Sequence, residues 1–198
     1  MGSREDIVAA AASIMREQGY ARATTKEIAR AAGYSEALLY KHFKDKTEIF
    51  LCVLTEENPP LAAIVEELVA SAGEQPIEAN ITRLVRGALD FFLGSFPIGV
   101  SVFSTKELLT AHRERLAEVG AGPRNPIDGV ALYLGKEIEL GRINPDANPE
   151  AAASLLLGAC FHHAFLCTYE AVEPEKSTLD ELATTLAKTA LSGLRLIP

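Results

Sequence analysis

Residues 24–46 of the chain read TTKEIARAAGYSEALLYKHFKDK, and this stretch decides the fold of the N-terminal part of the protein. Thr24 and the glutamate three residues later match a capping box, in which two side chains satisfy free backbone N–H groups at a helix start. Gly33 supplies a turn, since a residue without Cβ takes a positive φ at no steric cost. Ser35 then caps a second helix over residues 36–42. The pattern predicts a helix-turn-helix, whose second helix is of a size to enter a DNA major groove.

Basic residues surround this motif. Lys26 and Arg30 lie on the first predicted helix, and three lysines lie on or just after the second. Such side chains neutralise phosphates and release counterions. The whole chain has a net charge of −8, but residues 1–46 hold eight Lys and Arg against six Asp and Glu, whereas the remainder holds eleven against twenty-one. This asymmetry of charge predicts that DNA binds at the N-terminal end of the chain.

Residues 5–50 carry an ordered set of motifs at fixed spacing: Glu17-Gln18-Gly19-Tyr20, Thr24-Thr25, Ile28-Ala29, Ala32-Gly33-Tyr34-Ser35, Leu39-Tyr40-x-His42-Phe43 and Lys46. With these motifs the segment resembles the N-terminal domain of the TetR family of one-component transcription regulators. Two positions depart from the commonest family pattern: Thr25 stands where an aliphatic residue is frequent, and Ala37 where glycine is frequent. Neither change disturbs the two helices.

The resemblance implies a three-helix head whose third helix lies in the major groove. We expect Glu36 to accept from cytosine N4, Ala37 to touch a thymine methyl and Lys41 to reach guanine. Other polar groups are expected mainly at phosphates, with a helix N-terminus adding positive charge. Leu39 and Phe43 are expected to point into the core. The predicted DNA-binding set is Thr24, Thr25, Lys26, Ser35, Glu36, Ala37, Tyr40, Lys41, His42 and Lys46.

Nearly all of the remaining chain carries apolar residues at helical spacing, with no alternating strand pattern. We therefore expect an all-α fold of about nine helices. Residues 1–46 form the predicted helix-turn-helix DNA-binding domain, and residues 47–198 form a helical ligand-binding and dimerisation domain. A helix over residues 46–57 is expected to link them, and a helix break is expected at Gly94 and Pro97.

Composition narrows the class of protein. Hydrophobic residues make up 48% of the chain and charged residues 23%, which argues against disorder. The three cysteines cannot all pair within one chain, and neither a signal peptide nor an apolar run of membrane-spanning length is evident. We expect a cytoplasmic protein with reduced thiols, no cofactor and no membrane partner.

The C-terminal helices are expected to form a homodimer. A single head contacts too few bases for genomic selectivity, so a two-fold dimer on a near-palindromic operator in double-stranded DNA is expected. Residues 151–167 are apolar nearly all round, which favours pairing with a symmetry mate in a four-helix bundle. The alternative is a helix buried wholly in its own subunit. The predicted interface residues are Leu155, Ala159, His163, Leu166, Leu182 and Leu186.

The family resemblance also implies a pocket for a small-molecule inducer. Ligand binding would favour a conformation whose two heads no longer match the half-site spacing, so the simplest function is that of a repressor released by a small, largely apolar molecule. Aromatic residues at helical spacing also form ordinary core, and this is the alternative for each candidate. The candidates are Phe91, Phe92, Phe96, Phe103, His112, Tyr133, Phe161, His162, Phe165 and Tyr169.

Three alternatives remain open. Cys160, His163 and Cys167 share one face of a helix, so a metal- or thiol-sensing regulator of the same fold is one of them. An enzyme is a rival class, but the chain shows no glycine-rich phosphate loop, nucleophile elbow or paired Cys-x-x-Cys motif. We therefore expect no enzymatic activity. A helical scaffold that does not bind DNA would leave the basic head unexplained.

Overall fold

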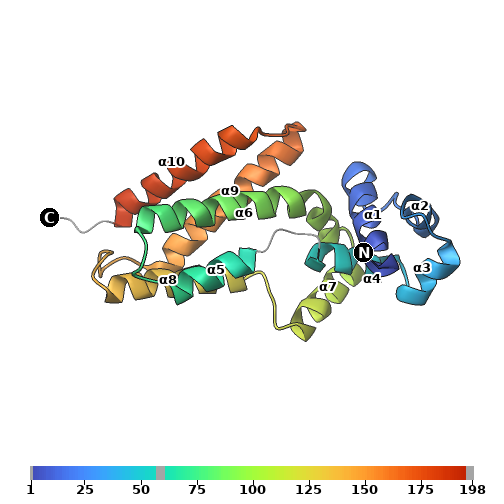
Figure 1. Ribbon diagram of the computed structural model, residues 1–198, viewed down its shortest axis with the longest axis horizontal. Helices are drawn as coiled ribbons and strands as arrows, with labels where there is room; N and C mark the ends of the chain where they lie inside the picture. The colour runs from blue at the N-terminus through green and yellow to red at the C-terminus, as the bar shows by residue number, and fades with distance from the viewer. Residues whose placement is uncertain (1, 57–60, 195–198) are drawn as a thin grey trace. The chain divides into compact units, whose positions relative to one another are not determined.

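The computed structural model describes residues 2–56 and 61–194. In these two ranges it contains ten α-helices, one 3-10 helix and no strand, so the predicted all-α class is confirmed (Figure 1). Residue 57, the last of the predicted linking helix, lies outside the described residues. The chain divides by its internal contacts into two compact units. The first contains residues 2–56 and 95–121, and the second contains residues 61–94 and 122–194.

The first unit is built around a core to which every one of its helices contributes. The inner face of α1 is fully buried, and Phe50 of α4 lies in the same core. Val102 and Leu108, more than fifty residues further along the chain, belong to it as well. This unit therefore extends beyond the predicted head of residues 1–46. Its helices are α1 (Ser3–Gln18), α2 (Thr25–Ala31), α3 (Glu36–His42), α4 (Lys46–Glu56), η1 (Val100–Ser104) and α7 (Lys106–Glu118).

The second unit is a helical bundle whose members approach closely at two glycines. A Cβ at Gly129 of α8 would collide with Val65 of α5, and a Cβ at Gly87 of α6 would collide with Ile64. These glycines therefore set the contact of α5 with its neighbours. The helices of the unit are α5 (Leu61–Ala70), most of α6 (Ile77–Gly99), α8 (Asn125–Glu139), α9 (Pro149–Glu170) and α10 (Lys176–Leu194).

The predicted helix break at Gly94 and Pro97 is wrong. Helix α6 continues through both residues to Gly99, and the chain then tightens into η1. Proline lacks the N–H that would donate to the carbonyl four residues earlier, and its ring crowds that carbonyl. The helix bears this cost for only two more residues, and Ile98 next to Pro97 is buried in the core of the first unit. The next α-helix begins at Lys106, where the Thr105 side chain accepts a hydrogen bond from the N–H of Leu108.

A buried carboxylate ties the loop after α5 to α8 within the second unit. Glu137 is fully buried, and its Oε1 accepts from the N–H of Gly73 at 3.1 Å. Its Oε2 lies 3.2 Å from Nε of Arg142, which also donates to the carbonyl of Gln75. One turn earlier, the Tyr133 hydroxyl accepts from the Asn80 amide at 3.1 Å. A buried charge is tolerated because a cation and hydrogen bonds compensate it.

By length and composition, Ile77–Ser104 and Pro149–Glu170 would each suffice to cross a membrane. Core helices of soluble proteins meet the same criterion. Six residues of α9 are buried in the structure, Cys160 and Ala164 among them. These segments are therefore weak grounds for a membrane protein.

Candidate nucleic-acid interface

The helix-turn-helix forms as its capping residues predict. The Thr24 hydroxyl accepts from the N–H of Glu27 at 3.2 Å, and the Glu27 carboxylate accepts from the Thr24 N–H at 3.2 Å. The turn passes through Gly33, whose φ of +81° is reached without strain only by glycine. Ser35 then accepts from the N–H of Leu38 and starts α3. Local hydrogen bonds between near neighbours thus define both helix starts.

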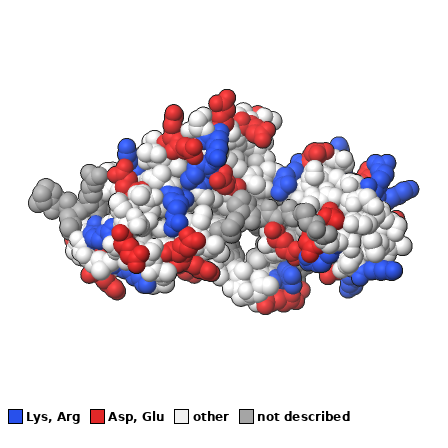
Figure 2. All heavy atoms as spheres, in the orientation of Figure 1, with Lys and Arg blue, Asp and Glu red and all other residues white. Residues whose placement is uncertain are grey.

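The inner face of the motif is apolar, as expected. Ile28 and Leu39 are fully buried, and Phe43 is 2% exposed. The opposite face of α3 carries Ala37 and Lys41, both exposed. Figure 2 shows Lys and Arg side chains spread over the surface around α2 and α3, at the right of the view. The structure thus brings the predicted base-contacting residues together on one exposed, basic surface.

Three predicted contact residues are bonded to one another. The Thr25 hydroxyl donates to Oε1 of Glu36 at 2.7 Å and lies 3.2 Å from the hydroxyl of Tyr40. Glu36 and Thr25 are half-buried, whereas Tyr40 is 52% exposed. These bonds join the start of α2 to the outer face of α3, so the two helices present their polar groups as one rigid surface.

The first turn of α1 supports α3 from the other side. The Ser3 hydroxyl and Nε2 of His42 are 2.7 Å apart, and the Tyr34 hydroxyl donates to Oδ2 of Asp6 at 2.8 Å. The Asp6 carboxylate raises the pKa of Tyr34 because it accepts a hydrogen bond from the neutral hydroxyl. The imidazole of His42 is exposed and lies at the end of the predicted recognition helix. These supporting residues carry no local sequence signal, because their partners lie 28 to 39 residues away.

The structure directs the ammonium group of Lys46 inward, to the turn that connects α1 and α2. Its Nζ donates to the carbonyls of Tyr20 at 2.9 Å, Ala23 at 3.0 Å and Ala21 at 3.4 Å. It also lies 4.3 Å from the centroid of the Tyr20 ring. Burial lowers the pKa of Lys46. All three ammonium protons therefore have protein acceptors, and the predicted phosphate contact of Lys46 stays a prediction.

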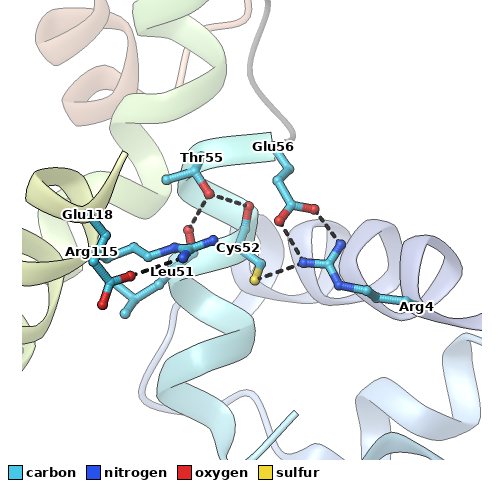
Figure 3. Close-up of polar contacts among 7 residues, drawn as sticks. All are labelled: Arg4, Leu51, Cys52, Thr55, Glu56, Arg115 and Glu118. Atoms are coloured by element: carbon cyan, nitrogen blue, oxygen red, sulfur yellow. Dashed lines mark hydrogen bonds and ion pairs between the residues drawn. The ribbon is translucent and has the colours of Figure 1, made fainter. Parts of the chain in front are cut away.

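An ion pair fastens the beginning of α1 to the end of α4, which sequence reasoning missed (Figure 3). The guanidinium of Arg4 makes two hydrogen bonds of 2.7 Å to the carboxylate of Glu56, and one of 3.4 Å to the buried thiol of Cys52. Arg4 lowers the pKa of Glu56, and burial raises the pKa of Cys52. A partner 52 residues away leaves no signal in the local pattern of the sequence.

The structure brings only some of the predicted pocket residues together. The ring of Phe92 meets those of Phe91 and Phe161 edge-on, with centroids 5.2 and 5.5 Å apart. Tyr133 is fully buried in the core of the second unit, and burial raises its pKa to about 12. Phe161, His162, Phe165 and Tyr169 lie on the exposed face of α9, where the last three stack in sequence. Phe91 and Phe92 are half-buried against the core of the second unit, whereas Phe96, Phe103 and His112 belong to the first unit. Whether any of them lines a ligand site stays a prediction.

An open depression of about 920 Å³ lies between α6 and α10 of the second unit, and none of the predicted aromatics lines it. Its cations are already paired: Arg86 contacts Asp90 and Asp180, and Arg83 contacts Glu67. The two arginines of this surface are therefore not free to bind an anion.

The predicted interface residues of the last two helices divide into two groups. Leu155 is 75% exposed, whereas Leu182 and Leu186 are half-buried against the core of their own unit. Ala159, His163 and Leu166 are half-buried. The face of α9 that carries Leu155 is therefore exposed and available for a partner.

The metal alternative finds no support in the geometry. Among the described residues, no three His, Cys, Asp or Glu side chains are grouped closely enough to hold an ion. The thiol of Cys160 is fully buried and lies 3.8 Å from the carbonyl of Val85, on the side of α6. Only His163 and Cys167 approach each other, at 3.5 Å. Burial raises the pKa of Cys160 to about 12, which disfavours the thiolate that binds metals.

Comparisons with known proteins agree with this arrangement. Residues 7–53 match the model of bacterial regulatory proteins of the tetR family. The HTH-type transcriptional repressor Rv1474c of Mycobacterium tuberculosis is 31% identical over 171 residues, covering 77% of this chain and 88% of that protein. The fatty acid metabolism regulator protein of Bacillus subtilis is 23% identical over 195 residues, covering 95% of this chain and 93% of that protein.

Among solved structures, the transcriptional regulator FadR of Bacillus subtilis in complex with stearoyl-CoA has a similar fold. Its TM-score is 0.68 at 16% identity, and the match covers 96% of this chain and 99% of that one. At this level of identity the likeness concerns the fold of the whole chain.

Proposed function

Because this chain belongs to the TetR family of bacterial transcriptional regulators, we propose that it is a ligand-responsive repressor that binds a near-palindromic operator as a dimer. The observation that carries the proposal is the capped helix-turn-helix with its exposed face on α3. Glu36, Ala37 and Lys41 would contact base edges. Tyr40, His42 and Thr24, which caps α2, would contact phosphates. Its place of action would be the cytoplasm, where operator DNA lies.

The exposed face of α9 supports the dimer. Leu155 and Tyr169 are 75% and 80% exposed, and Phe161 and Phe165 between them are 47% and 42% exposed. Such a row of large apolar side chains is uncommon on a monomer and typical of an interface. Burial against a symmetry mate would remove this area from water, at about 25 cal/mol for each Å². The two-fold axis would then present two α3 helices to adjacent half-sites.

The inducer would be a small, largely apolar molecule. FadR of Bacillus subtilis binds stearoyl-CoA, which carries a long apolar chain. The second unit of this chain is rich in apolar side chains, and the cations of the depression between α6 and α10 are paired. We infer that the ligand occupies a space that opens among the apolar helices when it binds. Release from DNA follows if the ligand favours a conformation with altered half-site spacing.

The experiment is a gel shift with the DNA upstream of the protein's own gene, repeated with acyl-CoA and other apolar ligands. Lys41→Ala should weaken binding to the preferred sequence more than to random DNA. Lys176→Ala is the matched control, because it removes the same charge from an exposed position in the second unit. Absence of DNA binding in a genome-wide selection would refute the proposal. Higher transcription of the target gene in the presence of the protein would make it an activator.

A further inference from the structure

The bonds among Thr25, Glu36 and Tyr40 have a defined direction. A glutamate carboxylate accepts hydrogen bonds and does not donate them. The single hydroxyl proton of Thr25 is therefore used in its 2.7 Å bond to Oε1 of Glu36. In the 3.2 Å contact between the two hydroxyls, Tyr40 must then be the donor. The hydroxyl of Tyr40 thus donates to Thr25, and the hydroxyl of Thr25 donates to Glu36.

This direction determines what each group has left for DNA. Oε1 of Glu36 is held by Thr25, and Oε2 remains as an acceptor on the half-buried side chain. A phosphate oxygen needs a hydrogen-bond donor, and the hydroxyl of Tyr40 already donates to Thr25. Tyr40 therefore binds phosphate as a donor only if its bond to Thr25 breaks. The hydroxyl proton of Thr25 is likewise unavailable to phosphate as long as it is hydrogen-bonded to Glu36.

We propose that Thr25 is a positioning residue for base recognition, which orients the Glu36 carboxylate so that Oε2 accepts from the amino group of a cytosine in the major groove. The proposal rests on DNA binding by α3. A free glutamate side chain has several rotamers, and fixing one of its oxygens selects among them. Thr25 contributes to specificity through Glu36, and it makes no essential phosphate contact itself.

The test compares sequence selection from a random double-stranded DNA library by the full-length protein and its variants. Thr25→Val removes the hydroxyl and keeps the shape of the side chain, whereas Thr25→Ser keeps a hydroxyl. Glu36→Ala identifies the base pair that Glu36 contacts. Thermal unfolding and circular dichroism establish that each variant is folded. Affinity for unselected DNA is measured alongside at several salt concentrations.

We expect Thr25→Val to reduce the preference for cytosine at the Glu36-dependent position by about five-fold or more, the lower range for one good base contact. Thr25→Ser, which keeps the hydroxyl, should retain the preference for cytosine. In the Glu36→Ala background, Thr25→Val should cause no further loss of preference, because the two residues act as one unit. Affinity for unselected DNA should be kept or slightly increased, because the Tyr40 proton becomes available to phosphate.

Two results would overturn the proposal while leaving the regulator assignment intact. One is an equal loss of affinity for all sequences on Thr25→Val, which would make Thr25 a phosphate contact. The other is a preference for cytosine that Thr25→Val leaves unchanged, whether or not Glu36→Ala removes it. If the wild-type protein selects no sequence at all, the assignment as a DNA-binding regulator fails together with the proposal.

Discussion

Replacing Lys46 by methionine should destabilise the first unit rather than simply weaken DNA binding. Methionine keeps an apolar stem over the Tyr20 ring but has no proton to donate. The change removes two well-placed bonds from Nζ, to the carbonyls of Tyr20 at 2.9 Å and Ala23 at 3.0 Å, and a weaker one at 3.4 Å. These bonds hold the turn between α1 and α2, and hence the start of the helix-turn-helix.

The magnitude can be worked out from the geometry. A hydrogen bond from a charged donor contributes about 1.5–3 kcal/mol, and a partly exposed cation–π contact about 0.5–1 kcal/mol. Burial already disfavours the charged ammonium, as its lowered pKa indicates, and water solvates part of the freed carbonyls. Both effects reduce the sum. We expect a loss of about 2–3 kcal/mol in the free energy of unfolding.

The assay is urea unfolding followed by far-UV circular dichroism, with Lys44→Met as the control. Lys44 is exposed and two residues away, so its replacement changes the net charge equally and should cost less than about 0.5 kcal/mol. A phosphate contact contributes about 0.9 to the slope of log affinity against log salt concentration. Lys46→Met should leave most of that slope in place. If the two variants are equally stable and Lys46→Met lowers the slope by about 0.9, the structural role argued for Lys46 is refuted.

Three further predictions concern the second unit. Arg142→Ala leaves the buried Glu137 without its cation and should lower the free energy of unfolding by about 3–5 kcal/mol in urea titrations. The pKa of Tyr133 is raised to about 12, above the value near 10 of an unfolded chain, so its stabilising contribution is complete below pH 10 and lost as the pH rises toward 12. Unfolding titrations between pH 9 and 12 should show this loss, at most about 2–3 kcal/mol. Leu155→Arg places a charge on the exposed face of α9 and should convert the proposed dimer to monomers in analytical ultracentrifugation.

Each of these has a matched control. Arg115→Ala breaks an exposed ion pair on α7 and should cost less than about 1 kcal/mol; an equal loss for Arg142→Ala would contradict the role of Glu137. Tyr133→Phe should reduce the alkaline loss of stability, and an unchanged loss would assign it to other groups. Leu132→Arg charges an exposed position on α8 and should leave the dimer intact. A stable dimer of Leu155→Arg would exclude this face of α9 as the interface.

The helix starts could be predicted because their hydrogen bonds join residues three apart. Thr24, Gly33 and Ser35 define the motif through their own conformational preferences, and the structure confirms each of them. The break expected at Pro97 was wrong because proline imposes only a local cost, which the burial of neighbouring residues such as Ile98 can outweigh.

The candidate site shows the same division. That Leu39 and Phe43 would be buried followed from apolar spacing, and the structure confirms it. That Lys46 donates to the turn after α1 did not follow, because its acceptors are backbone carbonyls that any sequence supplies. The ion pair of Arg4 with Glu56 joins residues 52 apart, and many equally plausible charge pairs exist along the chain.

By itself the sequence determined the class of fold, the position of the helix-turn-helix and the family, because caps, glycine turns and apolar periodicity act over a few residues. Only the tertiary structure decided which polar groups are available to DNA and which are used inside the protein. Thr25, Glu36 and Lys46 are all polar residues of a basic head, and the sequence offers each of them equally to DNA. Folding brings acceptors within about 3 Å of the donor atoms of Thr25 and Lys46, and a donor that is bonded inside the protein is not available to a phosphate or a base.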